Sequence, residues 1–390
     1  MKKFWKSILL LVVIVGGIGT YYVQSAIATN SLPDVTIETV EGDESLIEPL
    51  VFEGLVSHDE NEEQFLLSQG ETLYNGDLSF VERFEGVHNM TLNRLRQGYR
   101  DFMRGVDYLY RNVYEDNQRL ILVNVNESYS AYGVEDIELE VNMLNKGTEK
   151  SETYTMEIDS EQRINFYNIA DVQYSDGKVI VLTDLSERYQ DGSKPGITEL
   201  IFDIQSGELV SQETIISFDQ LEQDNIDQRI SQLGESVLYA PSEYVVFRKS
   251  QYEIVRNEQA DSLTEEMIEN ELLAYNVKTG EIEQLEIPQN ENSDVRYFDG
   301  SNLYFEKTKD GENFLSVYNI AEQDFQKDVP IGSDSHPYPY ILVNAGYIYM
   351  LNQEENHLNV ISVDTNKSVY KGEIKVKDEA EMNIYKMSFE

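Results

Sequence analysis

Apolar and polar residues alternate along most of the chain with the two-residue period of a β-strand. Residues 272–288, LLAYNVKTGEIEQLEIP, show the pattern most clearly: Leu273 and Tyr275 share one face, and Ala274 and Asn276 share the other. Asn276 opens a turn in which its side chain can accept a bond from a following backbone N–H, and Gly280 supplies the positive-φ position. This stretch predicts a β-hairpin.

Variants of this hairpin recur along the chain. They are LIFDIQSGELVSQETI from residue 200, LSVYNIAEQDFQKDVPI from 315, LNVISVDTNKSVYKGEI from 358 and a poorer copy, IELEVNMLNKGTEKSETYTMEI, from 137. The four better copies each follow another strand pair, and the spacing is 43 residues from Asn276 to Asn319 and 45 from there to Asp364. Four antiparallel strands at this period predict β-propeller blades, with a two-sheet sandwich or separate β domains as the alternative. The later copies lack the Gly, so we expect different turn types there.

The pattern therefore predicts an all-β fold, a β-propeller of four-stranded blades with seven or six blades and a few short helical insertions. We assign it to residues 50–390. The last strand, residues 381–389, has no partner of its own, and pairing with N-terminal strands in residues 50–85 would close the propeller.

Three segments show helical spacing instead. Residues 218–234 place Ile226, Ile230 and Leu233 at helical intervals, and residues 262–274 begin with Ser262 and Glu265 at capping-box spacing. Two short helices here would explain the 73 residues between the Asp203 and Asn276 turns. In residues 91–113 the apolar positions follow a 3-4 spacing, so a bent helix competes with an irregular loop that leads into a strand.

The N-terminal residues 1–30 predict an export signal or membrane anchor. Lys2, Lys3 and Lys6 precede a stretch without charge, residues 7–30. Two outcomes stay open: a single N-terminal span in the cell membrane with the domain outside, or secretion after cleavage near Ala28. Residues 31–49 then form an acidic stalk.

Composition narrows the possible functions. The net charge is −42, which disfavours nucleic acid as a partner. There is no Cys, so disulfides and thiolate metal sites are excluded, which fits a bacterial envelope protein. The four His residues show no H-x-x-x-H spacing, and we expect no metal or cofactor.

The FDIQSGE and YNVKTGE turns resemble the hairpins of the broad YVTN/WD40-like, or quinoprotein-like, β-propeller superfamily. The resemblance covers about two thirds of the chain and implies a propeller fold. No Trp-Asp or Gly-His pair marks the repeats, and the only Trp is Trp5 in the N-terminal segment, so a quinone cofactor is not expected.

Two stretches offer candidate ligand or partner surfaces. The first is Arg-rich, with Arg94, Arg96, Arg100, Arg104 and Arg111; these side chains either pair with acidic blades or form a patch for an anionic ligand. The second is the loop that contains His336, Tyr338 and Tyr340, which is either a rigid connector or the lining of a pocket. No catalytic residue is identified, because carboxyl pairs among 72 acids arise by chance.

These features favour an extracytoplasmic, membrane-anchored binding or scaffolding propeller of a bacterial cell envelope, and not an enzyme. Its partner would be an envelope protein or an anionic wall polymer. The alternative is a hydrolase or lyase that acts on envelope polymers through carboxylates at the propeller channel. Carboxyls with shifted pKa that converge in one pocket would favour the enzyme, and scattered acids would favour the binding protein.

Overall fold

The computed structural model describes residues 32–58, 61–68, 70–74, 90–106, 108–109, 111–130, 133–158, 163–189, 192–221, 225–234, 239–257, 262–287, 295–333, 339–377 and 380–389. The chain divides into two compact units. The first contains Met1–Arg94, Asp334–Leu342 and Gly346–Glu390, and the second contains Leu95–Ser333 and Val343–Ala345.

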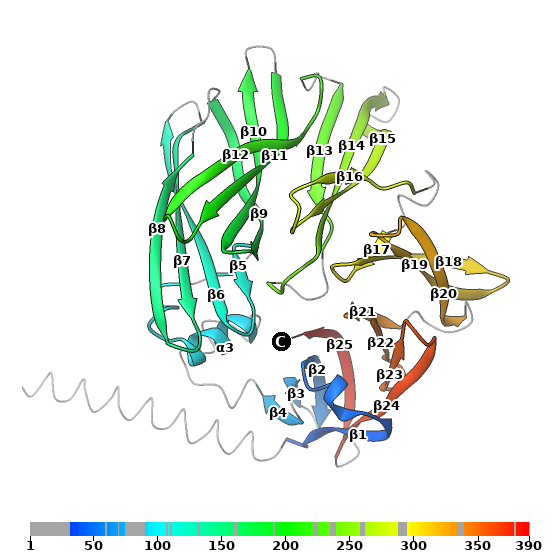
Figure 1. The fold of residues 1–390 in the computed structure, drawn as a ribbon. Coiled ribbons are helices and arrows are strands. Elements are labelled where there is room, and N and C mark those ends of the chain that lie inside the picture. Colours follow the sequence, from blue (N-terminus) through cyan, green and yellow to red (C-terminus); the bar gives the residue numbers. More distant parts are fainter. Residues whose placement is uncertain are drawn as a thin grey trace, which may run out of the picture. The chain divides into compact units, whose positions relative to one another are not determined.

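Two sheets make up the first unit (Figure 1). One has the order β25-β2-β3-β4, with β25 (Glu381–Phe389), β2 (Leu50–His58), β3 (Asn61–Ser68) and β4 (Glu71–Tyr74). The other has the order β1-β24-β23-β22-β21, with β1 (Val35–Gly42), β24 (Lys367–Val376), β23 (His357–Ser362), β22 (Tyr347–Asn352) and β21 (Tyr340–Asn344). A single 3-10 turn, η1 (Glu44–Leu46), lies between β1 and β2 among the described residues.

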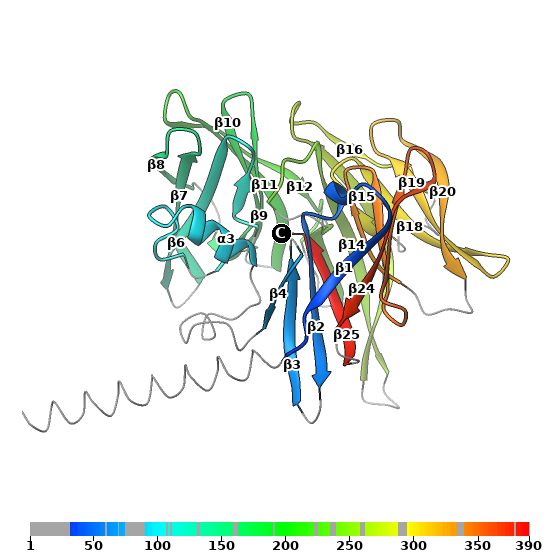
Figure 2. The same ribbon diagram turned by 90° about the horizontal axis from the view of Figure 1, so that it is seen from below.

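Strand β25, the last of the described strands, pairs with β2, the second. The pairing is antiparallel and runs from Leu50 opposite Phe389 to Ser57 opposite Glu381 (Figure 2). Ile384 and Met387 of β25 are fully buried in a core that they share with Phe52 of β2. Burial of these side chains stabilises the pairing of the two ends of the chain.

The second unit contains four four-stranded groups. β5 (Val113–Glu115), β6 (Arg119–Ser130), β7 (Gly133–Asn145) and β8 (Lys150–Glu157) form the first. β9 (Arg163–Ser175), β10 (Lys178–Tyr189), β11 (Gly192–Asp203) and β12 (Glu208–Ser217) form the second, which joins the first where Val134 pairs with Ile164. The third group contains β13 (Ile226–Gln232), β14 (Tyr244–Asn257), β15 (Ser262–Asn276) and β16 (Ile282–Gln284). The fourth contains β17 (Val295–Phe298), β18 (Asn302–Lys309), β19 (Glu312–Asn319) and β20 (Asp324–Ser333).

Consecutive groups of the second unit pack face to face through apolar cores. One core joins β5–β8 to β9–β12, a second joins β9–β12 to β13–β16, and a third joins β13–β16 to β17–β20. In the second core, Leu182 of β10 packs with Phe247 of β14 and Tyr275 of β15. The β9–β12 and β13–β16 groups therefore bury both faces against their neighbours, which is the packing of propeller blades.

The fold is all-β, a β-propeller of four-stranded antiparallel blades. Six blades are present in the described part of the chain, five with four strands and one with the additional strand β1, so the smaller of the two predicted blade numbers applies there. In the described part of residues 90–115, where a bent helix competed with an irregular loop leading into a strand, the chain forms helix α3 (Met90–Gly98), a series of turns and the short strand β5. Gly98 ends the helix, as its low helix propensity favours.

The two predicted helical insertions are wrong. Residues 226–232 form strand β13, and residues 262–276 form strand β15. Ile226 and Ile230 are four residues apart, an even interval that also places both on one face of a strand, so their spacing does not distinguish helix from strand. β15 pairs with β14 over fourteen positions, from Asn276 opposite Tyr244 to Ser262 opposite Asn257, and this pairing overrides the local capping pattern.

The hairpin turns are more uniform than predicted. The side chain of Asn276 accepts bonds from the N–H groups of Lys278 and Thr279, both at 3.0 Å, and Gly280 has φ +72°. The copies without Gly keep the positive φ: Gln323 and Asn366 occupy the position of Gly280 with φ +51° and +54°. The N–H of Asn366 bonds to the carbonyl of Ser362, as that of Gly280 does to Asn276, whereas the N–H of Gln323 bonds to the carbonyl of Ile320. The expectation of different turn types is therefore wrong at Asn366, because Asn accepts the left-handed conformation at a modest cost. At Gln323 the turn differs in its hydrogen bond.

Candidate functional site

A cluster of polar side chains in the second unit, formed by Arg111, Asp171, Gln173 and Gln232, lies between the first strands of consecutive blades. Its centre is Asp171 on β9, directly opposite Leu182 on β10, so both side chains face the β13–β16 blade. The Asp171 carboxylate accepts bonds from the N–H of Val172 at 2.8 Å and from Nε2 of Gln173 at 3.3 Å. Although the residue keeps some exposed surface, neighbours enclose its carboxyl, and this burial raises the pKa of Asp171 to about 6.

Side chains from neighbouring blades complete this cluster. Arg111, just before β5, donates a hydrogen bond from Nη1 to Oε1 of Gln232 at the end of β13. The Gln232 amide bonds to Asp171, and the positive charge of Arg111 also acts to lower the pKa of this carboxyl. Buried Gln173 accepts a bond at 3.1 Å from the N–H of Ser242, which precedes β14. The cluster thus links three consecutive blades.

Two further carboxyls with raised pKa face the same blade. Burial alone raises the pKa of Asp184 on β10 to about 6. Burial also raises the pKa of Glu199 on β11, while a hydrogen bond from the hydroxyl of Tyr275 on β15 opposes the rise. In the next blade, Asp171 therefore bonds to Gln232 and Glu199 bonds to Tyr275. For Asp184, burial is the cause of the raised pKa. These acids hold or border an interface between packed sheets.

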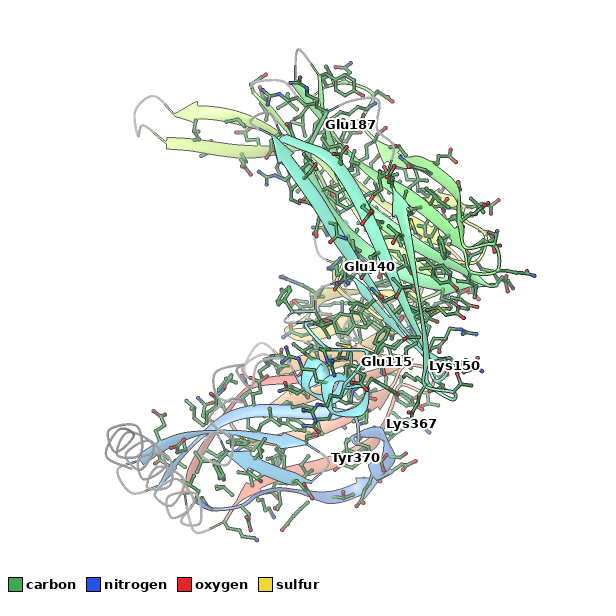
Figure 3. All side chains as sticks on the ribbon, turned by 90° about the vertical axis from the view of Figure 1, so that its left-hand side faces the viewer. Glu115, Glu140, Lys150, Glu187, Lys367 and Tyr370 are labelled. Atoms are coloured by element: carbon green, nitrogen blue, oxygen red, sulfur yellow. The ribbon has the colours of Figure 1, made fainter. Side chains whose placement is uncertain are left out.

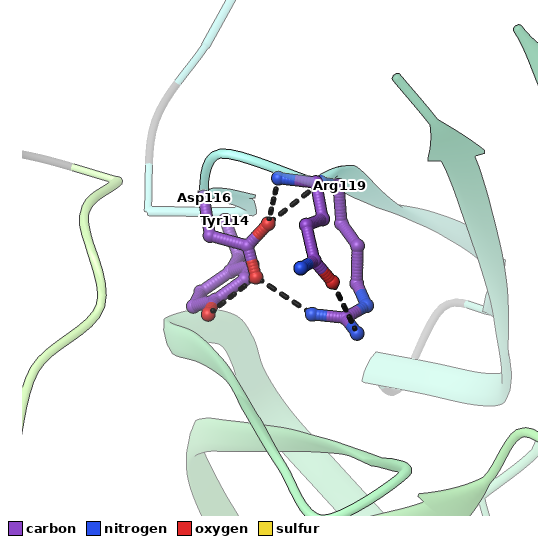
Figure 4. Close-up of polar contacts among 4 residues, drawn as sticks. Tyr114, Asp116 and Arg119 are labelled. Carbon is purple, nitrogen blue, oxygen red and sulfur yellow. Dashed lines mark hydrogen bonds and ion pairs between the residues drawn. The ribbon is translucent and has the colours of Figure 1, made fainter. Parts of the chain in front are cut away.

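A second polar cluster lies at the turn between β5 and β6 (Figure 4). Oδ1 of Asp116 accepts bonds from the N–H groups of Gln118 at 2.7 Å and Arg119 at 2.6 Å, and Oδ2 accepts bonds from Nη1 of Arg119 at 2.8 Å and from the hydroxyl of Tyr114 at 3.2 Å. Burial raises the pKa of Asp116, but these bonds outweigh it and lower the pKa overall. The Arg119 guanidinium stacks 4.0 Å from the centre of the Tyr174 ring. This arrangement fixes the turn between β5 and β6 and attaches it to β9 through Tyr174.

The predicted Arg residues occupy α3 and the turns after it. Arg96 donates to the carbonyl of Val106 from Nε at 3.2 Å and from Nη2 at 2.6 Å. Arg104 forms an ion pair with Asp101 at 2.9 Å, and both side chains are exposed. Arg100 is exposed and Arg94 is half-buried. The basic patch for an anionic ligand stays a prediction.

The second predicted surface falls mostly outside the described residues. His336 and Tyr338 belong to that undescribed stretch, whereas Tyr340 begins β21 and packs against the core of the first unit. Within the described ranges, no group of three or more His, Asp or Glu side chains is placed to hold a metal ion. No helix described by the structure is long and apolar enough to cross a membrane. The predicted anchor, residues 1–30, also lies outside the described part.

Sequence reasoning missed Asp171, Gln232, Glu199 and Tyr275. A signal for two of them exists: Asp171 interrupts the apolar run of NIADVQY, and Glu199 interrupts that of ITELIF. A carboxyl within a buried strand needs a partner, because an unpaired charge is costly to bury. The partners lie on another blade, so no local pattern reveals them.

The sequence matches no protein-family model and no curated protein. Among solved structures, TolB from Acinetobacter baumannii is similar at a TM-score of 0.31 and 10% identity, over 86% of this chain and 65% of that one. Apo AztD from Citrobacter koseri is similar at 0.30 and 9%, over 92% and 98%. The polysaccharide lyase Uly1 is similar at 0.36 and 14%, over 68% and 57%.

The chain spans less than two thirds of the TolB and lyase chains. At these TM-scores the likenesses carry no argument about function. The propeller assignment rests on the strand order within each sheet.

Proposed function

We propose that this protein is an extracytoplasmic binding propeller of a bacterial cell envelope, held at the membrane by its N-terminal segment. The location is supported by the sequence, in which three Lys residues precede a stretch of 24 uncharged residues, 7–30. The acidic propeller would then lie outside, and the Lys-rich end would stay in the cytoplasm.

The environment of the carboxyls supports binding over catalysis. A carboxyl-based hydrolase needs two carboxyls that act on one substrate, one as an acid and the other as a base or nucleophile. Here Asp171 bonds to Gln173 and Gln232, and Glu199 bonds to Tyr275. Both acids serve contacts between blades, which is a structural use of a raised pKa.

The observation that carries the proposal is the position of exposed apolar side chains on one hairpin. Leu263, Met267 and Ile268 on β15 are 68%, 45% and 55% exposed. Large apolar side chains that gather on one surface element are typical of a protein-interaction site. We therefore infer that the partner is an envelope protein.

Photo-crosslinking in intact cells tests this function. A photoreactive amino acid replaces Met267 in the full-length chain, and a matched variant carries it at Val210, an exposed apolar position on β12. We expect one discrete adduct with an envelope protein from the Met267 position and none from Val210. The same pattern of adducts from both positions would contradict specific binding.

An assay for catalysis separates the proposal from the alternative. Purified full-length protein is incubated with isolated cell envelopes, and soluble fragments are measured. We expect no release above that from heat-denatured protein. Release that depends on native protein would identify a polymer-degrading enzyme and contradict the binding proposal.

A further inference from the structure

Strands β14 and β15 form a hairpin that extends beyond the other strands of its blade. These strands pair through Asn257 opposite Ser262, whereas β16 covers only Leu273–Tyr275, with one further bond from the N–H of Leu285 to the carbonyl of Leu272. In the described part of the chain, no strand pairs with the outer edge of β15 over residues 262–271. Figure 3 shows this hairpin extending beyond the other strands of its sheet. Its free edge offers backbone N–H and C=O groups to another strand.

One face of this edge is apolar. Leu263 and Met267 alternate with Glu265 on it, and Met267 lies directly opposite Tyr252 of β14. Arg229 of β13 holds Glu265 at 2.7 Å and lies 4.7 Å from the centre of the Tyr252 ring. Arg229 also pairs with Asp227, so Glu265 is held by a shared ion pair within the blade. Leu263 and Met267 supply the exposed apolar surface of this face.

The other face is acidic. Glu266 of β15 lies directly opposite Glu253 of β14, and both are exposed. Like charges at directly opposite positions destabilise a strand pair. A cation placed beside them would remove this repulsion. Thr264, next to Glu266 on the same face, bonds to the carbonyl of Val255 at 3.2 Å.

We propose that the free edge of β15 binds an extended segment of a partner protein in which basic and apolar residues alternate. The partner strand would add to the sheet through backbone hydrogen bonds. Because side chains of a strand alternate between faces, its apolar residues would contact Leu263 and Met267 while its basic residues approach Glu266 and Glu253. This inference rests on the proposed binding function and names its surface and class of partner.

Charge argues against a second copy of this chain as the occupant. The chain carries 72 acidic and 30 basic residues, and the edge itself contains Glu265, Glu266, Glu269 and Glu271. Two such edges side by side would oppose like charges, which is a known protection of edge strands against self-pairing. A basic strand meets no such repulsion.

A peptide-binding measurement with the detergent-solubilised full-length protein tests the proposal. The probe is a labelled, end-capped peptide of alternating Lys and Val, as long as the free edge. Controls are a peptide of the same composition with Lys and Val in separate blocks, one with Glu in place of Lys, and one with N-methyl groups on alternate backbone nitrogens. We expect only the first peptide to bind, more weakly as salt increases.

Variants of the protein locate the binding edge. Glu266→Lys should weaken binding of the alternating peptide by about tenfold or more, because it places a positive charge beside the basic residues. The matched control is Glu157→Lys, which changes an exposed acid on the strand β8 and should leave binding unchanged. The double variant Leu263→Ser, Met267→Ser should also weaken binding, and circular dichroism checks that each variant is folded.

Four results would overturn the inference. They are no binding of the alternating peptide, equal binding of the N-methylated peptide, equal effects of Glu266→Lys and Glu157→Lys, and self-association in sedimentation that the double Ser variant abolishes. The last would assign the edge to a second copy of the chain. The peptide assay uses purified protein, whereas the crosslinking experiment uses intact cells. Failure of the peptide assay would therefore reject the binding edge and still leave the broader function to be tested by crosslinking.

Discussion

The hydroxyl of Tyr275 on β15 donates a hydrogen bond to the carboxylate of Glu199 on β11 and so joins two consecutive blades across 76 residues of sequence. Both residues are buried. Tyr275→Phe would leave the carboxylate without this donor, and we expect a loss of about 1–3 kcal/mol in the free energy of unfolding, measured by urea denaturation.

A double variant provides the control for this prediction. Adding Glu199→Leu to Tyr275→Phe replaces the buried carboxylate with an apolar side chain of similar size, so part of the lost stability should return. If Tyr275→Phe alone has no effect, the bond does not contribute to the packing of these blades.

The positive φ shared by Gly280 and Gln323 predicts opposite effects of substitution at these two positions. Gly280→Val should destabilise the protein, because a β-branched side chain resists the φ of +72°. Gln323→Gly should stabilise it by about 0.5–1 kcal/mol, since Gly adopts the φ of +51° without strain. Thermal unfolding measures both, and equal signs for the two changes would contradict the shared positive φ.

The raised pKa of Asp184 predicts that the stability of the protein depends on pH. Burial raises its pKa in the folded protein to about 6, above its ordinary value of about 3.9. The folded state therefore binds more protons between these values, so the contribution of Asp184 to stability falls as pH rises from about 4 to 6. Asp184→Asn should raise Tm near neutral pH, with a gain of about 1 kcal/mol after allowance for partial exposure, and should have little effect near pH 4.

The exposed residue Asp219 provides the matched control for that variant. Asp219→Asn should shift Tm little at either pH. A gain for Asp184→Asn that is the same at both pH values would contradict burial of the carboxylate as its cause.

The contacts of Arg96 and Arg104 predict unequal roles in the Arg-rich segment. Arg96 holds the carbonyl of Val106, whereas the Arg104–Asp101 pair is exposed and should contribute only about 0–1 kcal/mol. Arg96→Gln should therefore lower Tm, and the pair of changes Arg100→Gln and Arg104→Gln should not. Binding to isolated envelopes, measured at low and moderate salt, should stay unchanged in both proteins. A salt-sensitive loss of binding with unchanged Tm would make this segment a site for an anionic ligand.

Local features of the sequence predicted the fold well where the evidence lay within a few residues. The turns at Asn276 and Asp203 depend on a side-chain oxygen and a Gly four residues later, and both form as predicted. The alternation in β18, β19, β22 and β23 likewise gives paired strands. Such patterns can be read from one strand or turn alone.

Features that depend on distant partners could not be predicted. Residues 262–276 begin with a capping-box pattern and contain many acids, yet they form a strand because they pair with β14. The even interval between Ile226 and Ile230 fits either structure. Asp171 and Glu199 owe their raised pKa to burial against another blade, which no sequence interval encodes.

Cysteine accessibility in cells tests most directly the claim that the propeller lies outside the membrane. The chain has no Cys, so Glu157→Cys on β8 and Lys3→Cys near the N-terminus each introduce a unique thiol. Wall-stripped intact cells are treated with a membrane-impermeant maleimide, before and after lysis. We expect the Glu157→Cys protein to be labelled in intact cells and to sediment with membranes, whereas the Lys3→Cys protein should be labelled only after lysis. Labelling of the Glu157→Cys protein only after lysis would contradict this claim.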